Sequence, residues 1–139
     1  MGRLVHLAGY TPPQTGSFIP FLRSVLAEAK QRGWEVEAVF PAEARERDWV
    51  GDLREAGIEV SFASGTRAQL RGWLEAQLDG SAGPTILHTH FTVYDVAAAL
   101  AARRRDDVVV YWHVHSVLSR RPLAMAASAQ APVGRWRCR

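Results

Sequence analysis

The stretch that decides the fold is residues 4–17, Leu4-Val5-His6-Leu7-Ala8-Gly9-Tyr10-Thr11-Pro12-Pro13-Gln14-Thr15-Gly16-Ser17. The first six residues form a mainly apolar run, which is typical of a strand buried on both faces of a parallel sheet. A loop rich in Pro and Gly follows. Ser17 is then placed to cap a helix whose first turn contains Pro20, where a missing N–H costs little. The segment predicts a strand, a loop and a helix in succession.

The same unit recurs along the chain. We expect strands over residues 4–9, 35–40, 58–62, 85–90 and 108–113, and helices over residues 17–33, 44–56, 66–78 and 93–103. Strands that alternate with helices through short connections predict an α/β fold, here a three-layer Rossmann-like parallel sheet with strand order about 3-2-1-4-5.

Composition narrows the class of protein. The chain has 139 residues, of which 47% are hydrophobic and 22% charged, as expected for one globular domain. The single Cys138 excludes an internal disulfide and is compatible with a reducing compartment. Residues 1–6 lead directly into a strand without a signal-peptide pattern, and no apolar run is long enough to span a membrane. We therefore expect a cytoplasmic protein.

The charge distribution argues against nucleic acid as a partner. The chain up to Asp107 holds all 14 acidic residues and 12 of the 17 basic ones, whereas the five remaining arginines lie beyond it. A nucleic-acid-binding surface should instead run over the folded body. The run Arg103-Arg104-Arg105 closes an expected helix, where cations favour the C-terminal dipole. Peripheral contact with an anionic membrane is the alternative role of this run.

Histidines gather where a site is expected. In a parallel sheet of order 3-2-1-4-5, ligands bind beyond the carboxyl ends of strands 1 and 4, where the order reverses. His88-Thr89-His90 ends the fourth strand and His113-Val114-His115 ends the fifth, so four of the five histidines fall on one rim. His6 lies within a strand, and we expect it to be structural.

Three interpretations of these histidines remain open. The two pairs could bind zinc, but no acidic or Cys ligand accompanies them, and we expect neither a metal nor a cofactor. His88 and His113 could be hydrogen-bonded and merely shape the rim. Alternatively, His90 points into a cleft, where it holds a substrate hydroxyl or transfers a proton.

The loop before the first helix also has two interpretations. It lacks the spacing G-x-G-x-x-G of dinucleotide-binding loops and the Lys of a P-loop. The entry at Gly16-Ser17 could be a simple turn and cap, or its free N–H groups could receive a phosphate. Trp34, Trp49 and Trp73 lie on or beside helices, and we expect them to pack in the core.

These motifs together resemble those of the N-terminal domain of family 4 glycosyltransferases. The resemblance rests on residues 4–17, on Ile86-Leu87-His88-Thr89-His90 and on Trp112-His113-Val114-His115-Ser116, and it covers residues 3–121. It implies one half of a GT-B fold and a retaining transfer of sugar from a nucleotide-sugar donor to an acceptor hydroxyl on a glycan, a lipid-linked sugar or a small molecule. By the resemblance Thr15, Gly16 and Ser17 approach the donor diphosphate, although Thr15 replaces a glycine that is common there. His90 inherits the catalytic role.

The resemblance assigns His113 to the cleft, and we add His88, Tyr94 and His115 as expected substrate-binding residues. It also implies a second domain, which carries a pair of glutamates seven residues apart; no such domain is expected after Asp107, the last acidic residue of this sequence. We therefore expect residues 1–121 to be a truncated glycosyltransferase domain, inactive alone, and residues 122–139 to be an Ala/Arg-rich tail that is not native to the family. The alternative is a non-catalytic α/β binding or interaction domain. In either case the fifth strand is an exposed edge at which the chain could self-associate.

Overall fold

The computed structural model describes residues 1–81 and 83–115 and contains one five-stranded sheet. All strands are parallel and their order is β3-β2-β1-β4-β5, which confirms the predicted α/β architecture and the reversal between β1 and β4. The strands are β1 (Arg3–Ala8), β2 (Glu35–Phe40), β3 (Glu59–Phe62), β4 (Thr85–His90) and β5 (Val108–His113). The predicted bounds of β2, β4 and β5 are confirmed, and those of β1 and β3 shift by one residue.

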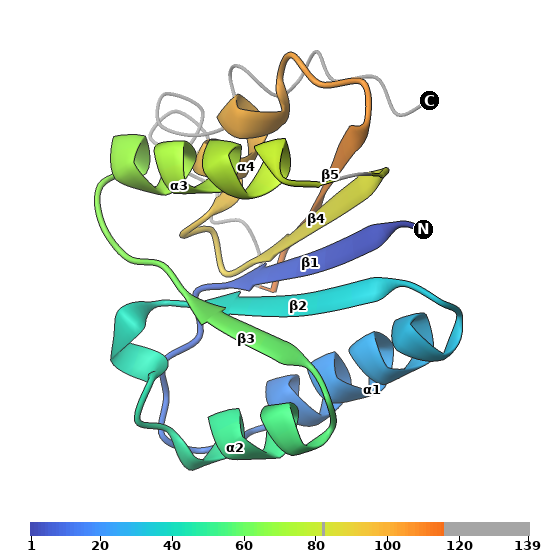
Figure 1. Ribbon diagram of the computed structural model, residues 1–139. Coiled ribbons are helices and arrows are strands. Elements are labelled where there is room, and N and C mark those ends of the chain that lie inside the picture. Colours follow the sequence, from blue (N-terminus) through green and yellow to red (C-terminus); the bar gives the residue numbers. More distant parts are fainter. Residues whose placement is uncertain (82, 116–139) are drawn as a thin grey trace.

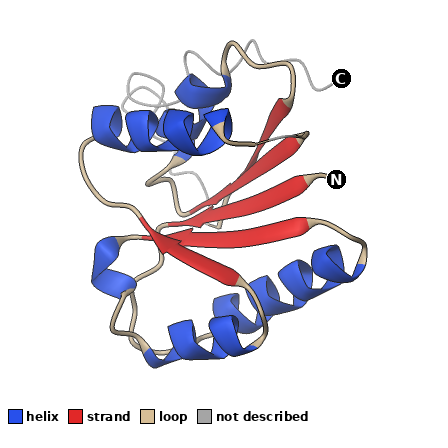
Figure 2. Cartoon of the chain, viewed as in Figure 1, coloured by secondary structure: helices blue, strands red, loops and turns tan. Residues whose placement is uncertain are grey.

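Four α-helices enclose the sheet in two layers. They are α1 (Phe18–Gln31), α2 (Asp48–Glu55), α3 (Arg67–Asp79) and α4 (Asp95–Ala102). Figure 1 shows α1 and α2 on one face of the sheet and α3 and α4 on the other, with the strands fanned between them as in Figure 2. Right-handed crossovers produce this division, because the chain moves from β1 toward one edge and then returns to build the other half.

The second helix differs from the prediction. In place of one helix over residues 44–56, a short 3-10 turn, η1 (Ala42–Ala44), precedes α2. Arg47 is extended at the N-cap of α2, so the helix cannot run through it. The indole of Trp49 donates a hydrogen bond to the Pro12 carbonyl at 3.0 Å, and this contact anchors α2 to the loop after β1.

Each face of the sheet has its own core. Leu22 and Leu26 of α1 pack with Trp49 on one face, and Leu70 and Leu74 of α3 lie on the other, all fully or almost fully buried. The expected packing role of Trp49 is confirmed, and Trp34 and Trp73 are partly buried against the cores. Thr66 and Gln69 form a capping box at the start of α3, which the sequence analysis did not identify.

Alanines form the buried side of α4. The residues of α4 buried against the sheet and α3 are alanines, whereas Val96 and Leu100 are only half-buried. A helix lined with alanine can approach its neighbours closely, which explains this choice of inward face. Arg105, after α4, forms ion pairs with Asp79 at 2.8 Å and Asp107 at 2.9 Å.

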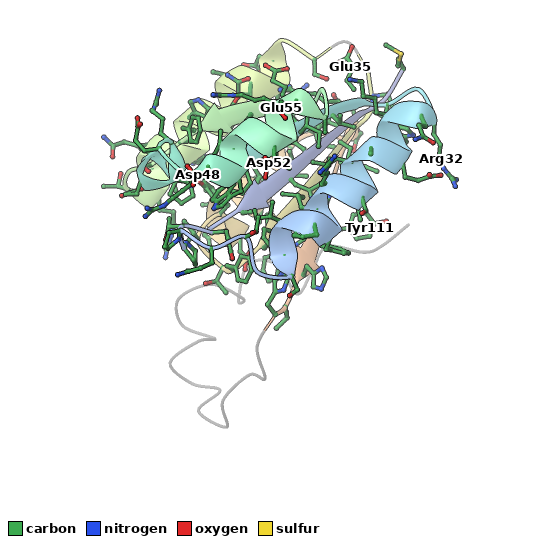
Figure 3. All side chains as sticks on the ribbon, turned by 90° about the horizontal axis from the view of Figure 1, so that it is seen from below. Arg32, Glu35, Asp48, Asp52, Glu55 and Tyr111 are labelled. Carbon is green, nitrogen blue, oxygen red and sulfur yellow. The ribbon has the colours of Figure 1, made fainter. Side chains whose placement is uncertain are left out.

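The β5 side of the sheet is the more exposed one. Among the described residues β5 pairs only with β4, and the side chains of Val109 and Tyr111 are 50% and 54% exposed. In Figure 3, viewed from the side of α1 and α2, Tyr111 lies at the margin of α1. Within the described part of the chain, no helix combines the length and the apolar character needed to cross a bilayer. The expected tail over residues 122–139 and the domain end at residue 121 lie outside the described residues.

Candidate functional site

The carboxyl edge of the sheet gathers the histidines in one place. The strand register aligns His6 with His88 and aligns Ala8, His90 and His113 in a row across β1, β4 and β5. Side chains two residues apart share a face, so these histidines all point toward the face that α1 covers. His115, two residues beyond His113, joins them. The prediction that His88, His90, His113 and His115 lie together is confirmed.

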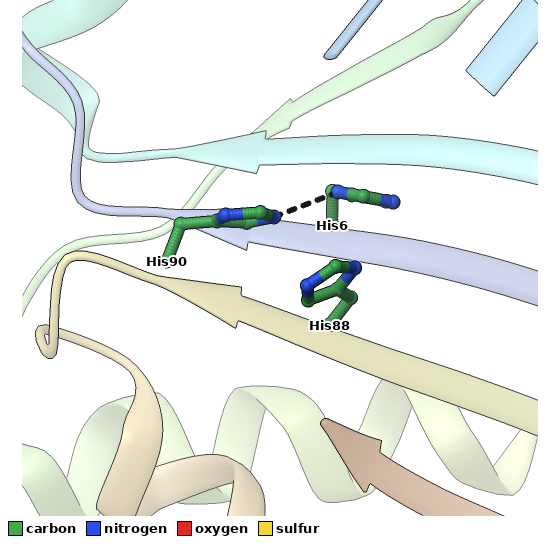
Figure 4. A group of neighbouring side chains, drawn as sticks. All are labelled: His6, His88 and His90. Carbon is green, nitrogen blue, oxygen red and sulfur yellow. Dashed lines mark hydrogen bonds between the residues drawn. The ribbon is translucent and has the colours of Figure 1, made fainter. Parts of the chain in front are cut away.

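His6 is the member of this cluster that the sequence analysis missed. Its ring lies 4.5 Å from that of His88 and 5.0 Å from that of His90, between ring centroids. Its Nδ1 atom is 2.9 Å from His90 Nε2, a hydrogen bond drawn in Figure 4. His6 is structural as expected, but it also determines how His90 is held. Only the register between β1 and β4 reveals this, and a pattern in a single strand does not.

His90 lies at the centre of the cluster and is fully buried. Its Nε2 atom faces His6, and its Nδ1 atom is 2.9 Å from His115 Nε2. In the described structure, both ring nitrogens of His90 therefore have partners within the cluster, and the ring presents no free nitrogen to a cleft. The expectation that His88 and His113 are hydrogen-bonded is not met, since the bonds among the described residues join His6, His90 and His115.

Burial keeps four of these histidine rings neutral. Loss of hydration, reinforced by the neighbouring histidines, lowers the pKa of His6 to about 3 and that of His90 to about 2. The same two causes lower the pKa of His88 to about 4 and lower the pKa of His115. Desolvation disfavours the charged imidazolium, and each neighbouring imidazolium would repel the next. These four rings are therefore neutral imidazoles at pH 7.

The loop before α1 reaches the histidine cluster. Thr15, Gly16 and Ser17 are all exposed, and Gly16 has φ 55°, a left-handed conformation that glycine adopts readily. Ser17 occupies the N-cap of α1, but the predicted cap by its hydroxyl is wrong, since its side chain makes no capping bond. The Phe18 ring lies 5.1 Å from His90 and 5.5 Å from His115. The predicted diphosphate loop and the histidines are thus neighbours.

Tyr94 has a different role from the one expected. It is fully buried, and its hydroxyl donates a hydrogen bond to the Ala63 carbonyl at 2.7 Å. Burial raises the pKa of this phenol above its ordinary range. In the described structure, Tyr94 therefore ties the loop after β4 to the end of β3 and presents no group to a substrate.

Two further features of the rim were not apparent from the sequence. An open hollow of about 480 Å³ lies beyond β1, β2 and β3, and its lining includes Gly9, Glu43 and Arg47 but no histidine. Phe91 and Thr92, directly after His90, adopt φ values of 63° and 57°. Two successive non-glycine residues in this region store roughly 1–3 kcal/mol each, and such strain concentrates at functional sites.

The histidines form two overlapping groups that could hold a metal ion. His6, His88 and His90 form one group, and His90, His113 and His115 form the other. In each group the candidate ligand atoms lie within 4.8 Å of one another. Comparison with known proteins identifies no relative, since no family model, curated protein or solved structure matches the chain.

Proposed function

We propose that this chain is the acceptor-side domain of a retaining glycosyltransferase, which transfers a sugar from a nucleotide-sugar donor to a hydroxyl. One observation carries the proposal. The Gly16 turn after β1 and the histidines that end β4 lie together at the point where the strand order reverses. Ligands of parallel α/β sheets bind at this point. The resemblance of the same residues to those of family 4 glycosyltransferases is the second support for the proposal.

The Gly16 turn supplies the features that a diphosphate needs. It opens a 14-residue helix with no acidic residue in its first turn, so the positive end of the helix dipole faces no internal anion. Thr15, Gly16 and Ser17 are exposed, and their backbone can be approached closely. In the proposed enzyme these three residues contact the donor diphosphate.

The histidines supply hydrogen-bonding groups beside that turn. His113 and His115 present exposed imidazoles, and His90 holds the ring of His115 through its Nδ1 atom. In the proposed enzyme the exposed rings bind the acceptor hydroxyl. His90 acts by passing a proton along the contact with His115 or by exchanging that contact for one with substrate. His88, half-buried behind them, completes the wall.

The test is reconstitution with a donor-binding half. The chain is mixed with a separately expressed C-terminal domain of a GT-B enzyme, and release of nucleotide from a panel of nucleotide sugars is measured with and without acceptors. We expect turnover only in the mixture. It should fall in His90→Gln, because the relay to His115 is lost. The same loss in folded Ser24→Ala, a change on the exposed side of α1, would contradict the assignment of His90.

The turn has a matched control at the other end of the same helix. Gly16 and Gly33 both have positive φ values, 55° and 84°, so alanine strains the backbone at each. Gly16→Ala also brings a methyl group about 3.0 Å from the Tyr10 hydroxyl, whereas a methyl group at Gly33 meets nothing within 4 Å. We expect only Gly16→Ala to weaken donor use. Equal losses in both variants would mean that strain in α1, and not the anion site, is responsible.

The second candidate is a non-catalytic binding or interaction domain, and the burial of His90 favours it. A fully buried ring with both nitrogens paired is typical of a structural histidine. This function predicts no turnover in any mixture. One partner would be a second copy of the chain at the β5 edge, where Val109 and Tyr111 are exposed. Sedimentation velocity then detects a dimer that Tyr111→Lys dissociates.

The membrane contact proposed for residues 103–105 is separate from either function. Arg105 is already engaged by Asp79 and Asp107, which leaves Arg103 and Arg104 as the exposed cations of the run. Co-sedimentation with vesicles that contain anionic lipid tests this contact. Arg103→Gln combined with Arg104→Gln should abolish it, and equal binding to neutral vesicles would exclude it.

A further inference from the structure

We propose that His90, His113 and His115 form a binding site for one divalent transition-metal ion, with Zn²⁺ as the reference ion. Imidazole nitrogen is a preferred ligand of zinc, copper and nickel, and three protein ligands leave a position for an exogenous group. The inference stands on the geometry of the histidines and does not depend on glycosyl transfer.

The three side chains are close to the required arrangement. Their candidate ligand nitrogens lie within 4.8 Å of one another. With Zn–N distances of about 2.0–2.1 Å, a tetrahedral ion holds its ligand nitrogens about 3.4 Å apart. The 2.9 Å contact between His90 Nδ1 and His115 Nε2 must open slightly to reach this separation. His113 and His115 are exposed, so their rings can make these movements without disturbing the core.

His6 is placed to orient the buried ligand. When His90 directs the lone pair of Nδ1 toward the ion, its Nε2–H donates to His6 Nδ1, 2.9 Å away. A ligating histidine usually donates its second N–H to such an acceptor, which fixes the ring and its tautomer. The proton of His6 then resides on Nε2, the buried atom that has no hydrogen-bond partner among the described residues. His6 is a positioning residue in this site and does not touch the ion.

The chemistry of the cluster suits a cation despite the lack of a carboxylate. Neutral imidazole nitrogens are sufficient ligands for zinc, so the site needs no carboxylate. Binding requires His115 to move its proton from Nε2 to Nδ1, so no net proton is released. The ring of Phe18, at the start of α1, lies 5.5 Å from that of His115, so the three histidines lie close to the Gly16 turn. An anionic oxygen is the natural ligand there.

The alternative group of His6, His88 and His90 is less suitable. His6 and His90 are both fully buried, so ligand movement there would disturb the packing between α1 and the sheet. An ion bound between His6 Nδ1 and His90 Nε2 would also replace the hydrogen bond that orients His90. The outer group keeps that bond, and it is exposed to entering ions.

The experiment measures ion uptake by the whole chain in a Cys138→Ser background, which removes the only thiol. Zn²⁺ affinity is measured at pH 7.5 by competition with a chromophoric chelator, and Co²⁺ is titrated to record its visible d–d bands. We expect one ion per chain and the intense bands of four-coordinate Co²⁺. His113→Gln and His115→Gln should each abolish uptake. His6→Gln should weaken it by about 10–100-fold, as observed when the acceptor of a ligating histidine is removed.

His88→Gln is the matched control, because it changes another ring of the same cluster by the same substitution. It should retain the stoichiometry, the affinity and the Co²⁺ spectrum. Loss of uptake in His88→Gln with retention in His113→Gln would overturn the proposal in favour of the buried group. Absence of Zn²⁺ and Co²⁺ uptake by the folded parent chain would overturn it altogether. Far-UV circular dichroism of each variant separates loss of the site from loss of the fold.

Discussion

Mild acid should destabilise this protein through its buried histidines. His6 and His90 are fully buried, and their pKa values in the folded chain are lowered to about 3 and about 2. In the unfolded chain each returns to about 6.5. As the pH falls below 6.5, the unfolded state therefore binds protons that the folded state does not bind. Stability is greatest above pH 6.5 and is lost progressively toward the folded pKa values.

The magnitude follows from proton linkage. At pH 5.5 each histidine is about 90% protonated when unfolded and neutral when folded, which costs about 1.4 kcal/mol. The two buried rings together remove about 3 kcal/mol between pH 7.5 and 5.5, a large share of the roughly 5–15 kcal/mol typical of a domain.

Urea unfolding followed by tryptophan fluorescence measures the effect, with EDTA present to exclude metal ions. With a urea m-value of about 1–3 kcal/mol/M, the midpoint should fall by about 1–3 M between pH 7.5 and 5.5. His6→Gln removes one of these groups, while His90 and the neighbouring His88, whose pKa is also lowered, remain. Its midpoint should therefore change less with pH than that of the parent chain, whatever its absolute stability. A midpoint that is constant over this range, or an identical slope in His6→Gln, would refute the reasoning.

Three other substitutions test the packing, the ion pair within the sheet and the helix cap, each by urea unfolding at pH 7.5. Leu22→Ala leaves a cavity between α1 and the sheet, where Leu22 is fully buried, and should cost about 2–5 kcal/mol; a loss below 1 kcal/mol would mean that the site collapses around it. Arg3→Ala strands the buried Glu37 carboxylate and should cost about 3–5 kcal/mol, with Arg3→Ala/Glu37→Gln recovering part of the loss. Thr66→Ala removes the capping bond to Gln69 and should cost about 0.5–2 kcal/mol, whereas Ser17→Ala, with no such bond, should cost less.

The sheet was predictable because each strand can be recognised from its own residues and the turn residues beside it. The runs 35–40, 85–90 and 108–113 have the bounds expected from apolar composition and turn residues. The strand order was the one typical of Rossmann-like sheets, the class that the alternation of strands and helices indicated. The interruption before α2 was not predictable, because it depends on a contact made far along the chain. Trp49 meets the Pro12 carbonyl only after the loop from β1 has folded over that helix.

The position of the candidate site in the fold was predictable, whereas the contacts among its side chains were not. The two His-x-His pairs indicated the rim, because side chains two residues apart share a strand face. The inclusion of His6 required the register of β1 against β4, which the pattern of one strand does not contain. Tyr94 was expected at the site because it follows His90 closely in the sequence. Its ring instead turns into the core, where its hydroxyl bonds to Ala63. The hollow beside Glu43 and Arg47 is built from separate loops and has no local signature.

The contact between Tyr94 and Ala63 has a consequence for motion at the rim. The amide of Ala63 also donates to the Phe40 carbonyl at 2.9 Å, so one short chain of bonds links the ends of β2 and β3 to the loop after β4. Segments joined through buried bonds open as cooperative units. We expect the loops at the ends of β3 and β4 to fluctuate together, so that their amides exchange with solvent at a common rate. On this reasoning these two loops move as one unit, and the hydrogen bond from the Tyr94 hydroxyl couples them.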